Sequence, residues 1–234
     1  MEYGRGVVGT SAKPSSHGSA EEGPAEIANR AAADEDRHTP RRRRSAILSS
    51  AEQEFAQSGY DRTKVAAIAK RAGYPLAVVY RTFPGGKMQI WNELNADRFN
   101  DLVSFVLQNS RGESLPAKRM LDSIRSAYVY LCNHPNFLEL HFREGFNWAT
   151  ASDSGRGTLR RTWTVAVDIF IEMAAADGGV AKASHFSPSQ VARLAISTVQ
   201  IWLHEWWHSS RETDIEEDAD RLVSFLSLWL RDEN

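Results

Sequence analysis

The stretch that decides the fold is residues 51–87, AEQEFAQSGYDRTKVAAIAKRAGYPLAVVYRTFPGGK. Its apolar residues recur every three or four positions, which is the period of an amphipathic helix, and glycines interrupt the pattern. The pattern predicts a helix that ends at Gly59 and a second one capped by Thr63 and closed by Gly73. A short third helix follows, with Pro75 in its first turn. Short helices joined by a glycine turn predict a helix-turn-helix unit.

Working outward, Thr39 is a suitable N-cap for the first helix, with Pro40 at its first position. A fourth helix is expected to start near Lys87, after the Pro84-Gly85-Gly86 break. The side chains expected to form the small core of the unit are Phe55, Val65, Ile68, Val79 and Phe83.

Helical patterns continue to the end of the chain and no convincing strand is seen, so the predicted fold class is all-α. Breaks at glycine, proline and small polar residues place the helices at about 87–108, 116–133, 136–147, 157–176, 188–209 and 214–231. We expect a disordered N-terminal extension over 1–39, a helix-turn-helix domain over 40–87 and a helical ligand-binding and dimerisation domain over 88–234. Residues 1–39 show no apolar periodicity and cannot bury enough surface to offset their conformational entropy.

Charge is distributed unevenly along these segments. Residues 1–39 carry four basic and seven acidic side chains, residues 40–87 carry ten and three, and residues 88–234 carry fourteen and twenty. The segment nets are therefore −3, +7 and −6, although the whole chain is only −2. A compact basic block beside an acidic remainder is typical of a protein that binds a polyanion such as DNA.

Other features restrict the class of protein. Cys132 is the single cysteine, which excludes an internal disulfide framework and fits a reducing compartment. No apolar run is long enough for a transmembrane helix and no secretory signal pattern is seen, so we expect a cytoplasmic protein without membrane contact. Phosphate-binding loops and nucleophile elbows are not found, so no cofactor and no enzyme activity are expected.

The order Phe55, then Gly59-Tyr60, then Thr63-x-Val65-x-x-Ile68-Ala69, then Ala72-Gly73, then Tyr80-x-x-Phe83, then Lys87 resembles the N-terminal domain of TetR-family transcriptional regulators. The resemblance covers about fifty residues, with several anchors at fixed offsets. It implies a ligand-responsive DNA-binding regulator, usually a repressor, that binds a pseudo-palindromic operator as a homodimer. It also implies that the third helix enters the major groove, which is wide enough to admit it.

The resemblance implies a set of DNA contacts. Thr63, Tyr80, Thr82 and Lys87 would contact phosphates, and the arginine run would lie along the backbone or in a minor groove. The third helix departs from the usual pattern, because its start lacks polar groups that could reach base edges; readout would rest on thymine methyl groups and on Arg81. The complete set of expected DNA-binding residues is Arg41, Arg42, Arg43, Arg44, Thr63, Lys64, Pro75, Leu76, Ala77, Val78, Tyr80, Arg81, Thr82 and Lys87.

The remaining helices are expected to form a ligand cavity and a dimer contact. A mixture of aromatic and polar residues can line an apolar pocket, and an apolar or aromatic small-molecule effector is expected. Its candidate residues are Phe137, His141, Phe142, Phe146, Trp148, Trp163 and Phe170, each of which is equally compatible with ordinary core. The family implies a four-helix bundle from the last two helices of each protomer, and its candidates are Leu194, Trp202, Trp206, Leu222, Phe225 and Trp229.

Two alternative functions remain open from the residues alone. His204-Glu205-Trp206-Trp207-His208 matches the zinc-peptidase pattern His-Glu-x-x-His, in which two histidines bind zinc and the glutamate activates water. Only Asp214 lies near a third-ligand spacing, and the two histidines continue a polar helix face, so no metal is assigned here. The other alternative is a helical protein-interaction module whose third helix, apolar at its start, no longer reads DNA.

Overall fold

The computed structural model describes residues 39–110, 115–144, 158–176, 186–209 and 213–230. Every regular element in these ranges is an α-helix, and no helix among the described residues is long and apolar enough to cross a membrane. The chain divides into two compact units at Arg42–Arg43, and only residues 39–42 of the first unit are described. They open helix α2 (Pro40–Arg62), where Thr39 Oγ1 accepts a hydrogen bond from the backbone N–H of Arg42 at 3.4 Å, as expected for an N-cap.

The helix-turn-helix head is built from α2, α3 (Val65–Ala72) and α4 (Leu76–Thr82). Gly59 interrupts α2 with φ 74° and ψ 163°, a backbone conformation that is essentially restricted to glycine. Gly73 closes α3 at φ 73°, where its N–H donates to Lys70 and the next N–H, of Tyr74, donates to Ala69. This left-handed C-cap sets the turn between the two helices of the motif.

The core of the head confirms the predicted set. Phe55, Ile68, Val79 and Phe83 are fully buried and Val65 packs against them. The sequence pattern did not single out Trp91, which contacts Phe55 edge-to-face at a centroid distance of 5.1 Å and belongs to the next helix. The first helix after the motif is therefore part of the core of the head.

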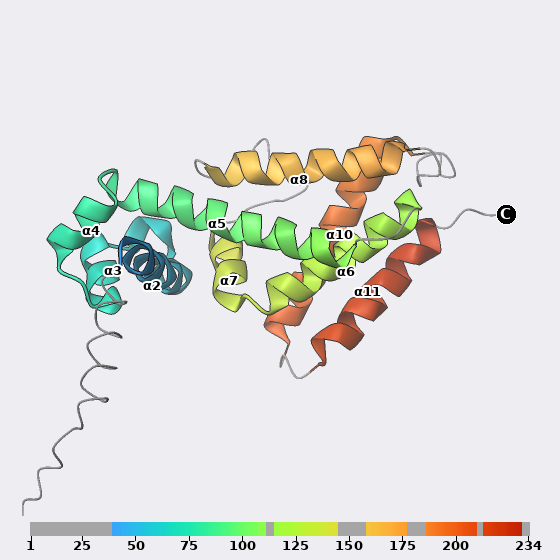
Figure 1. Cartoon of the computed structure of the whole chain (residues 1–234). Coiled ribbons are helices and arrows are strands. Elements are labelled where there is room, and N and C mark those ends of the chain that lie inside the picture. Colours follow the sequence, from blue (N-terminus) through green and yellow to red (C-terminus); the bar gives the residue numbers. More distant parts are fainter. Residues whose placement is uncertain (1–38, 111–114, 145–157, 177–185, 210–212, 231–234) are drawn as a thin grey trace, which may run out of the picture. The chain divides into compact units, whose positions relative to one another are not determined.

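The body consists of α5 (Gly86–Asn109), α6 (Pro116–Cys132), α7 (Pro135–Arg143), α8 (Thr158–Ala175), α10 (Pro188–His208) and α11 (Ile215–Leu230). Helix α6 packs against α5, α7, α8, α10 and α11, and α10 also packs on α8 (Figure 1). The observed bounds agree with the predicted helices to within one or two residues, except that the described part of α7 ends at Arg143 rather than near 147. The predicted disordered extension over 1–39 lies outside the described residues, apart from Thr39 at its end.

Candidate DNA-binding surface and ligand cavity

One face of helix α4 is buried in the head, and the opposite face is exposed. Val79 and Phe83 are fully buried, whereas Leu76 and Tyr80 are 43% and 47% exposed. Pro75, Ala77 and Arg81 are also exposed, and Val78 and Thr82 are half-buried. Leu76, Ala77 and Tyr80 therefore offer an outward face of the kind that a major-groove helix needs. The apolar start of this face agrees with the expected departure from polar base readout.

Lys87 has a structural role that the sequence did not reveal. Its Nζ donates to the backbone carbonyl oxygens of Tyr60, Asp61 and Thr63 at 2.9, 3.2 and 3.0 Å. The ammonium also lies 4.5 Å from the centroid of the Tyr60 ring, a cation–π arrangement. Because an ammonium has three N–H donors, these carbonyls occupy all of them. Lys87 thus fastens the start of α5 to the turn between α2 and α3.

Thr63 also differs from its expected role. The N-cap of α3 is Lys64 rather than Thr63, and no side chain caps that end. Thr63 is only 3% exposed, and its hydroxyl oxygen lies 2.7 Å from the carbonyl oxygen of Gly59 and 3.1 Å from that of Glu54. Its hydroxyl therefore holds the turn that follows Gly59, while Lys64 beside it is exposed.

The arginine run is not uniform. Arg41 and Arg42 lie exposed in the first turn of α2. Arg44, by contrast, forms ion pairs with Glu93 at 2.7 Å and with Asp97 at 3.0 Å, both on α5. These carboxylates raise the pKa of the Arg44 guanidinium even though burial acts against it. Arg44 consequently joins α2 to α5, a role that an arginine run read in isolation did not indicate.

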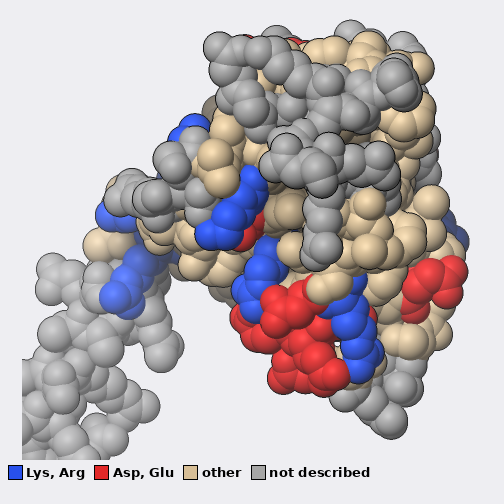
Figure 2. All heavy atoms as spheres, turned by 90° about the vertical axis from the view of Figure 1, so that its right-hand side faces the viewer, with Lys and Arg blue, Asp and Glu red and all other residues tan. Residues whose placement is uncertain are grey.

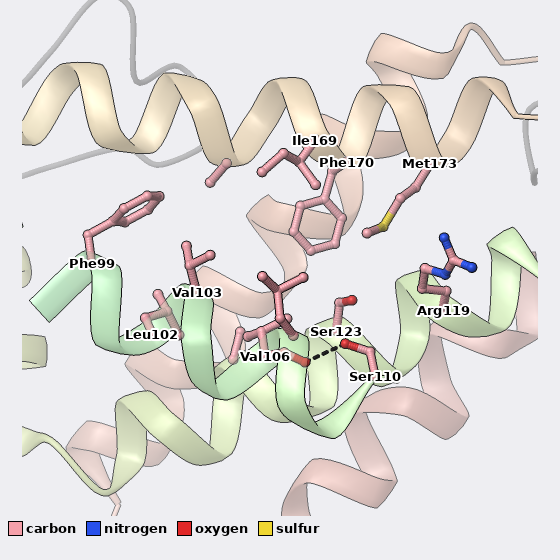
Figure 3. Close-up of a pocket in the computed structure, with 13 residues that line it drawn as sticks. Phe99, Leu102, Val103, Val106, Ser110, Arg119, Ser123, Ile169, Phe170 and Met173 are labelled. Carbon is pink, nitrogen blue, oxygen red and sulfur yellow. Dashed lines mark hydrogen bonds between the residues drawn. The ribbon is translucent and has the colours of Figure 1, made fainter. Parts of the chain in front are cut away.

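A cavity of about 410 Å³ lies among α5, α6 and α8. Helix α5 lines it with side chains from Phe99 to Leu107 and with its C-cap Ser110. Helix α6 contributes Arg119, Ser123 and Ala127, and α8 contributes residues from Ala166 to Met173 (Figure 3). The volume is within the range of small-molecule sites, and the lining is mostly apolar with few polar groups, as such sites usually are.

The predicted ligand residues are distributed over different places. Phe170 lines the cavity, but Phe137 and His141 are fully buried in the core, where burial lowers the pKa of His141 to about 4. Phe142 lies elsewhere, with its ring edge-on to His204 at a centroid distance of 5.5 Å. Phe146, Trp148 and the side chain of Trp163 lie outside the described residues. The α5 lining was missed because an apolar helix face has the same pattern whether it borders a cavity or a packed core.

The last two helices expose a set of apolar side chains. Leu194 and Ile201 on α10 are 47% and 64% exposed, and Phe225 and Leu228 on α11 are 47% and 72% exposed. Of the predicted dimer residues, Trp206 is 7% exposed and Leu222 is fully buried, so both belong to the core of the protomer rather than to its surface. The side chain of Trp229 lies outside the described part of the chain.

Helices α6, α10 and α11 meet at a polar junction. Asp218 on α11 accepts a short hydrogen bond from the Tyr128 hydroxyl on α6 and a second one, of 3.1 Å, from Trp202 Nε1 on α10. Burial and the Asp218 carboxylate both raise the pKa of Tyr128 above its usual range, so the phenol stays protonated and donates. Trp202 is thus positioned by its own protomer.

Ion pairs reinforce the contact between α6 and α11. Arg125 pairs with Glu216 at 2.8 Å and with Asp220 at 2.6 Å. Figure 2 shows acidic and basic side chains next to one another on this face, with the largest group of acidic side chains lying between basic ones.

The His204-Glu205-x-x-His208 motif lies on an exposed face of α10. The two imidazole rings are 4.3 Å apart by centroid. Asp214, the candidate third ligand, instead caps α11, where its Oδ1 accepts from the N–H groups of Glu216 and Glu217. Among the described residues no group of three histidine, cysteine or carboxylate side chains could hold a metal ion.

Comparisons with known proteins agree with this geometry. Residues 47–94, from α2 into the first half of α5, match the family model described as bacterial regulatory proteins, tetR family. The transcriptional regulator FadR from Bacillus subtilis, solved with stearoyl-CoA, is similar with a TM-score of 0.61 at 14% identity; the match covers 78% of this chain and 96% of that one. A search of curated proteins finds no match.

Two further solved structures show the same likeness. The fatty acid degradation regulator FadR from Bacillus halodurans has a TM-score of 0.65 at 14% identity, covering 79% of this chain and 94% of that one. A tetR-family regulatory protein from Rhodococcus RHA1 has a TM-score of 0.65 at 16% identity, covering 82% and 98%. At these identities the likeness shows the fold.

The described residues form a helix-turn-helix head, which the family model matches, on an all-helical body. Residues 47–94 thus resemble the tetR family of bacterial regulatory proteins, and the remaining described helices share the fold of solved regulators of that family.

Proposed function

We propose that this protein is a ligand-responsive repressor that binds a pseudo-palindromic operator as a homodimer. Residues 40–87 form its DNA-binding domain, and residues 88–234 form the domain that binds the effector and the second protomer. The observation that carries this proposal is the dual use of α5: its first turns are core to the DNA-binding head and its last turns line the cavity.

DNA contacts are assigned to the outward face of the head. Leu76, Ala77 and Arg81 would face base edges and Tyr80 a phosphate. Arg41 and Lys64, both exposed, would add contacts to the backbone. Lys87 and Thr63 would act mainly by holding the turn after α2, and a phosphate would have to share the Lys87 ammonium with the carbonyls that it already binds.

Effector binding would change the geometry of the heads through α5. Ile90 and Trp91 are fully buried in the head, and Val103 and Val106 of the same helix line the cavity. A ligand that pushes α5 away from α8 would tilt its start, which Lys87 and Arg44 tie to the head. In a dimer this tilt changes the distance between the two α4 helices, so that they no longer fit successive major grooves.

A homodimer through α10 and α11 is supported by their exposed apolar side chains Leu194, Ile201, Phe225 and Leu228. Exposed apolar side chains on the last two helices are most simply covered by a second copy in two-fold symmetry. One head alone buries too little surface for tight specific binding, so dimerisation also fits the DNA-binding role. The stearoyl-CoA in the Bacillus subtilis neighbour supports a small-molecule effector.

The test is a gel-shift titration of the purified chain against DNA from upstream of its own gene, at two salt concentrations. We expect sequence-dependent binding that weakens steeply with salt, because Lys and Arg displace counterions from phosphates. Binding without sequence preference, or no binding, would favour the helical interaction module. A zinc hydrolase would show metal-dependent peptide cleavage. We do not expect it, because Asp214, the candidate third ligand by spacing, caps α11.

A further inference from the structure

The cavity among α5, α6 and α8 has one feature that ordinary packing does not explain. Ser123 is only 2% exposed, and its Oγ has no hydrogen-bond partner among the described residues. Leaving a buried hydroxyl unpaired costs free energy of about 1–3 kcal/mol. Because Ser123 lines the cavity, a bound molecule can supply the missing partner.

The other polar groups of the lining lie near Ser123. Ser110 and Arg119 are found at the same end of the cavity, and Phe99 marks the opposite end (Figure 3). The Ser110 hydroxyl donates to the carbonyl of Val106 in a short hydrogen bond. Arg119, one turn before Ser123 and exposed, is the one charged side chain in the lining that the structure describes, and it places a guanidinium at this end.

The rest of the lining is apolar and extends along α5. On α5 it includes Phe99, Leu102, Val103, Val106 and Leu107, and on α8 Ala166, Ile169, Phe170 and Met173 face them. From Phe99 to Ser110, a helix rising 1.5 Å per residue extends about 16 Å. An extended chain of dodecanoate is of comparable length.

We propose that the effector is a straight-chain carboxylate, with its aliphatic chain between α5 and α8 and its carboxylate accepting a hydrogen bond from Ser123 and pairing with Arg119. This inference rests on the proposed function and names the chemistry of the effector. The carboxylate satisfies the buried hydroxyl, and a charge-assisted hydrogen bond is roughly twice as strong as a neutral one. The N-terminal turn of α6, which carries Arg119, adds partial positive charge near the same end.

The first experiment compares head groups by calorimetric titration of the full-length protein with dodecanoate, methyl dodecanoate and dodecylamine. Dodecanoate should bind with one molecule per chain. The methyl ester keeps the carbonyl acceptor but not the charge, and should bind about tenfold more weakly; the cationic amine should bind more weakly still. Equal binding of the three probes, or no binding of dodecanoate, would overturn the proposal.

The second experiment places the ligand in this cavity. Ser123→Ala should weaken dodecanoate binding about tenfold, the worth of one good hydrogen bond. Ser126→Ala is the matched control, because its hydroxyl donates to the Asp122 carbonyl of its own helix and does not line this cavity. Arg119→Gln, at an exposed position, should remove the preference for the acid over the methyl ester. Unchanged affinity in both Ser123→Ala and Arg119→Gln would refute the assignment.

A third variant tests whether dodecanoate binds in this cavity or non-specifically to the protein surface. Ala166→Trp should fill the cavity and abolish binding of dodecanoate, while circular dichroism shows the helical fold retained. If dodecanoate still bound, this cavity would not be its site. Operator binding by the ligand-free protein is measured in parallel: if it persists while dodecanoate does not bind, the effector class is wrong and the regulator stands, whereas its loss would contradict the proposed function.

Discussion

The backbone N–H of Tyr60 donates a hydrogen bond of 3.2 Å to Glu144 Oε1, at the end of α7, across 84 positions of the chain. Tyr60 belongs to the head: its ring packs on Phe55 and Trp91, and its carbonyl accepts from Lys87. Glu144 belongs to the body. The pair is therefore a second connection between the two parts, besides α5.

We expect Glu144→Ala to reduce the effector-induced change in operator affinity by several-fold, because the body would then act on the head without this hydrogen bond. Removing a hydrogen bond to a carboxylate should cost about 2 kcal/mol of the free energy of unfolding. The readout is operator affinity by fluorescence anisotropy with and without effector. Glu139→Ala is the control, since Glu139 pairs with Arg143 on its own helix. An unchanged response in Glu144→Ala would show that the hydrogen bond carries no coupling.

The ion pair of Glu52 and Arg98 joins α2 to α5. Arg98 Nη2 lies 2.6 Å from Glu52 Oε2, whose side chain is only 5% exposed. Arg98→Met should lower the free energy of unfolding by about 3 kcal/mol, at the low end for a broken buried pair because Arg98 is partly exposed. Urea unfolding measures this. The double variant Glu52→Gln with Arg98→Met should be more stable than Arg98→Met alone, because it no longer buries the Glu52 carboxylate without a partner. A double variant as unstable as Arg98→Met, or less stable, would show that this carboxylate does not cause the loss.

His141 predicts a pH dependence of stability. Burial lowers its pKa to about 4 in the folded protein, against about 6.5 when unfolded. Below pH 6.5 the unfolded chain takes up a proton that the folded one does not, so stability falls as the pH drops toward 4 and is restored above 6.5. The loss should reach about 3 kcal/mol. Urea unfolding of wild type and His141→Gln across this range checks it: an identical slope in both would assign the effect to other groups.

Arg81 is exposed on α4 and is the one basic side chain of that helix. Arg81→Ala should weaken operator binding by about 1–3 kcal/mol, and mainly at one or two base pairs, if its guanidinium reads a guanine. Binding is measured against a panel of single-base operator variants. Uniform weakening over the whole panel would show that Arg81 contacts phosphate only.

Ile201 and Phe225 are exposed apolar residues of the proposed dimer surface. Ile201→Asp and Phe225→Asp should each shift the protein toward monomer in analytical ultracentrifugation, because a charge buried in an apolar contact is costly. Val165→Asp on α8, at a position 52% exposed, should leave the dimer intact. If both Ile201→Asp and Phe225→Asp remained dimeric, the dimer contact would not involve these two residues.

Much of the fold could be predicted from the sequence, because apolar residues recur at helical spacing and glycine or proline residues mark where the helices end. Gly59, Gly73 and Pro75 delimit the head where the pattern placed them. The face of α4 was predictable as well, since burying Val79 and Phe83 leaves Tyr80 outward.

The sites could be predicted only in part. The roles of Lys87 and Arg44 depend on carbonyls and carboxylates that are distant in sequence, and no local pattern encodes such pairs. A ligand cavity in the helical body was predicted, and Phe170 lines it, but the lining from α5 was missed. Val106, which borders the void, and Leu222, which lies in a packed core, follow the same helical period. Phe137 and His141 were predicted to bind ligand because they lie in an aromatic-rich stretch, but both are buried in the core.

The division of α5 into two functional parts has a practical consequence. The apolar side chains of α5 that are buried in the head, such as Ile90 and Trp91, lie about two turns before those that border the void, which begin at Phe99. Asp97 and Arg98, between the two sets, still pair with α2. Under the proposed function, laboratory evolution of the residues that border the void would change which metabolite is detected while the operator that is read stays the same, and such a chain would suit genetically encoded biosensors.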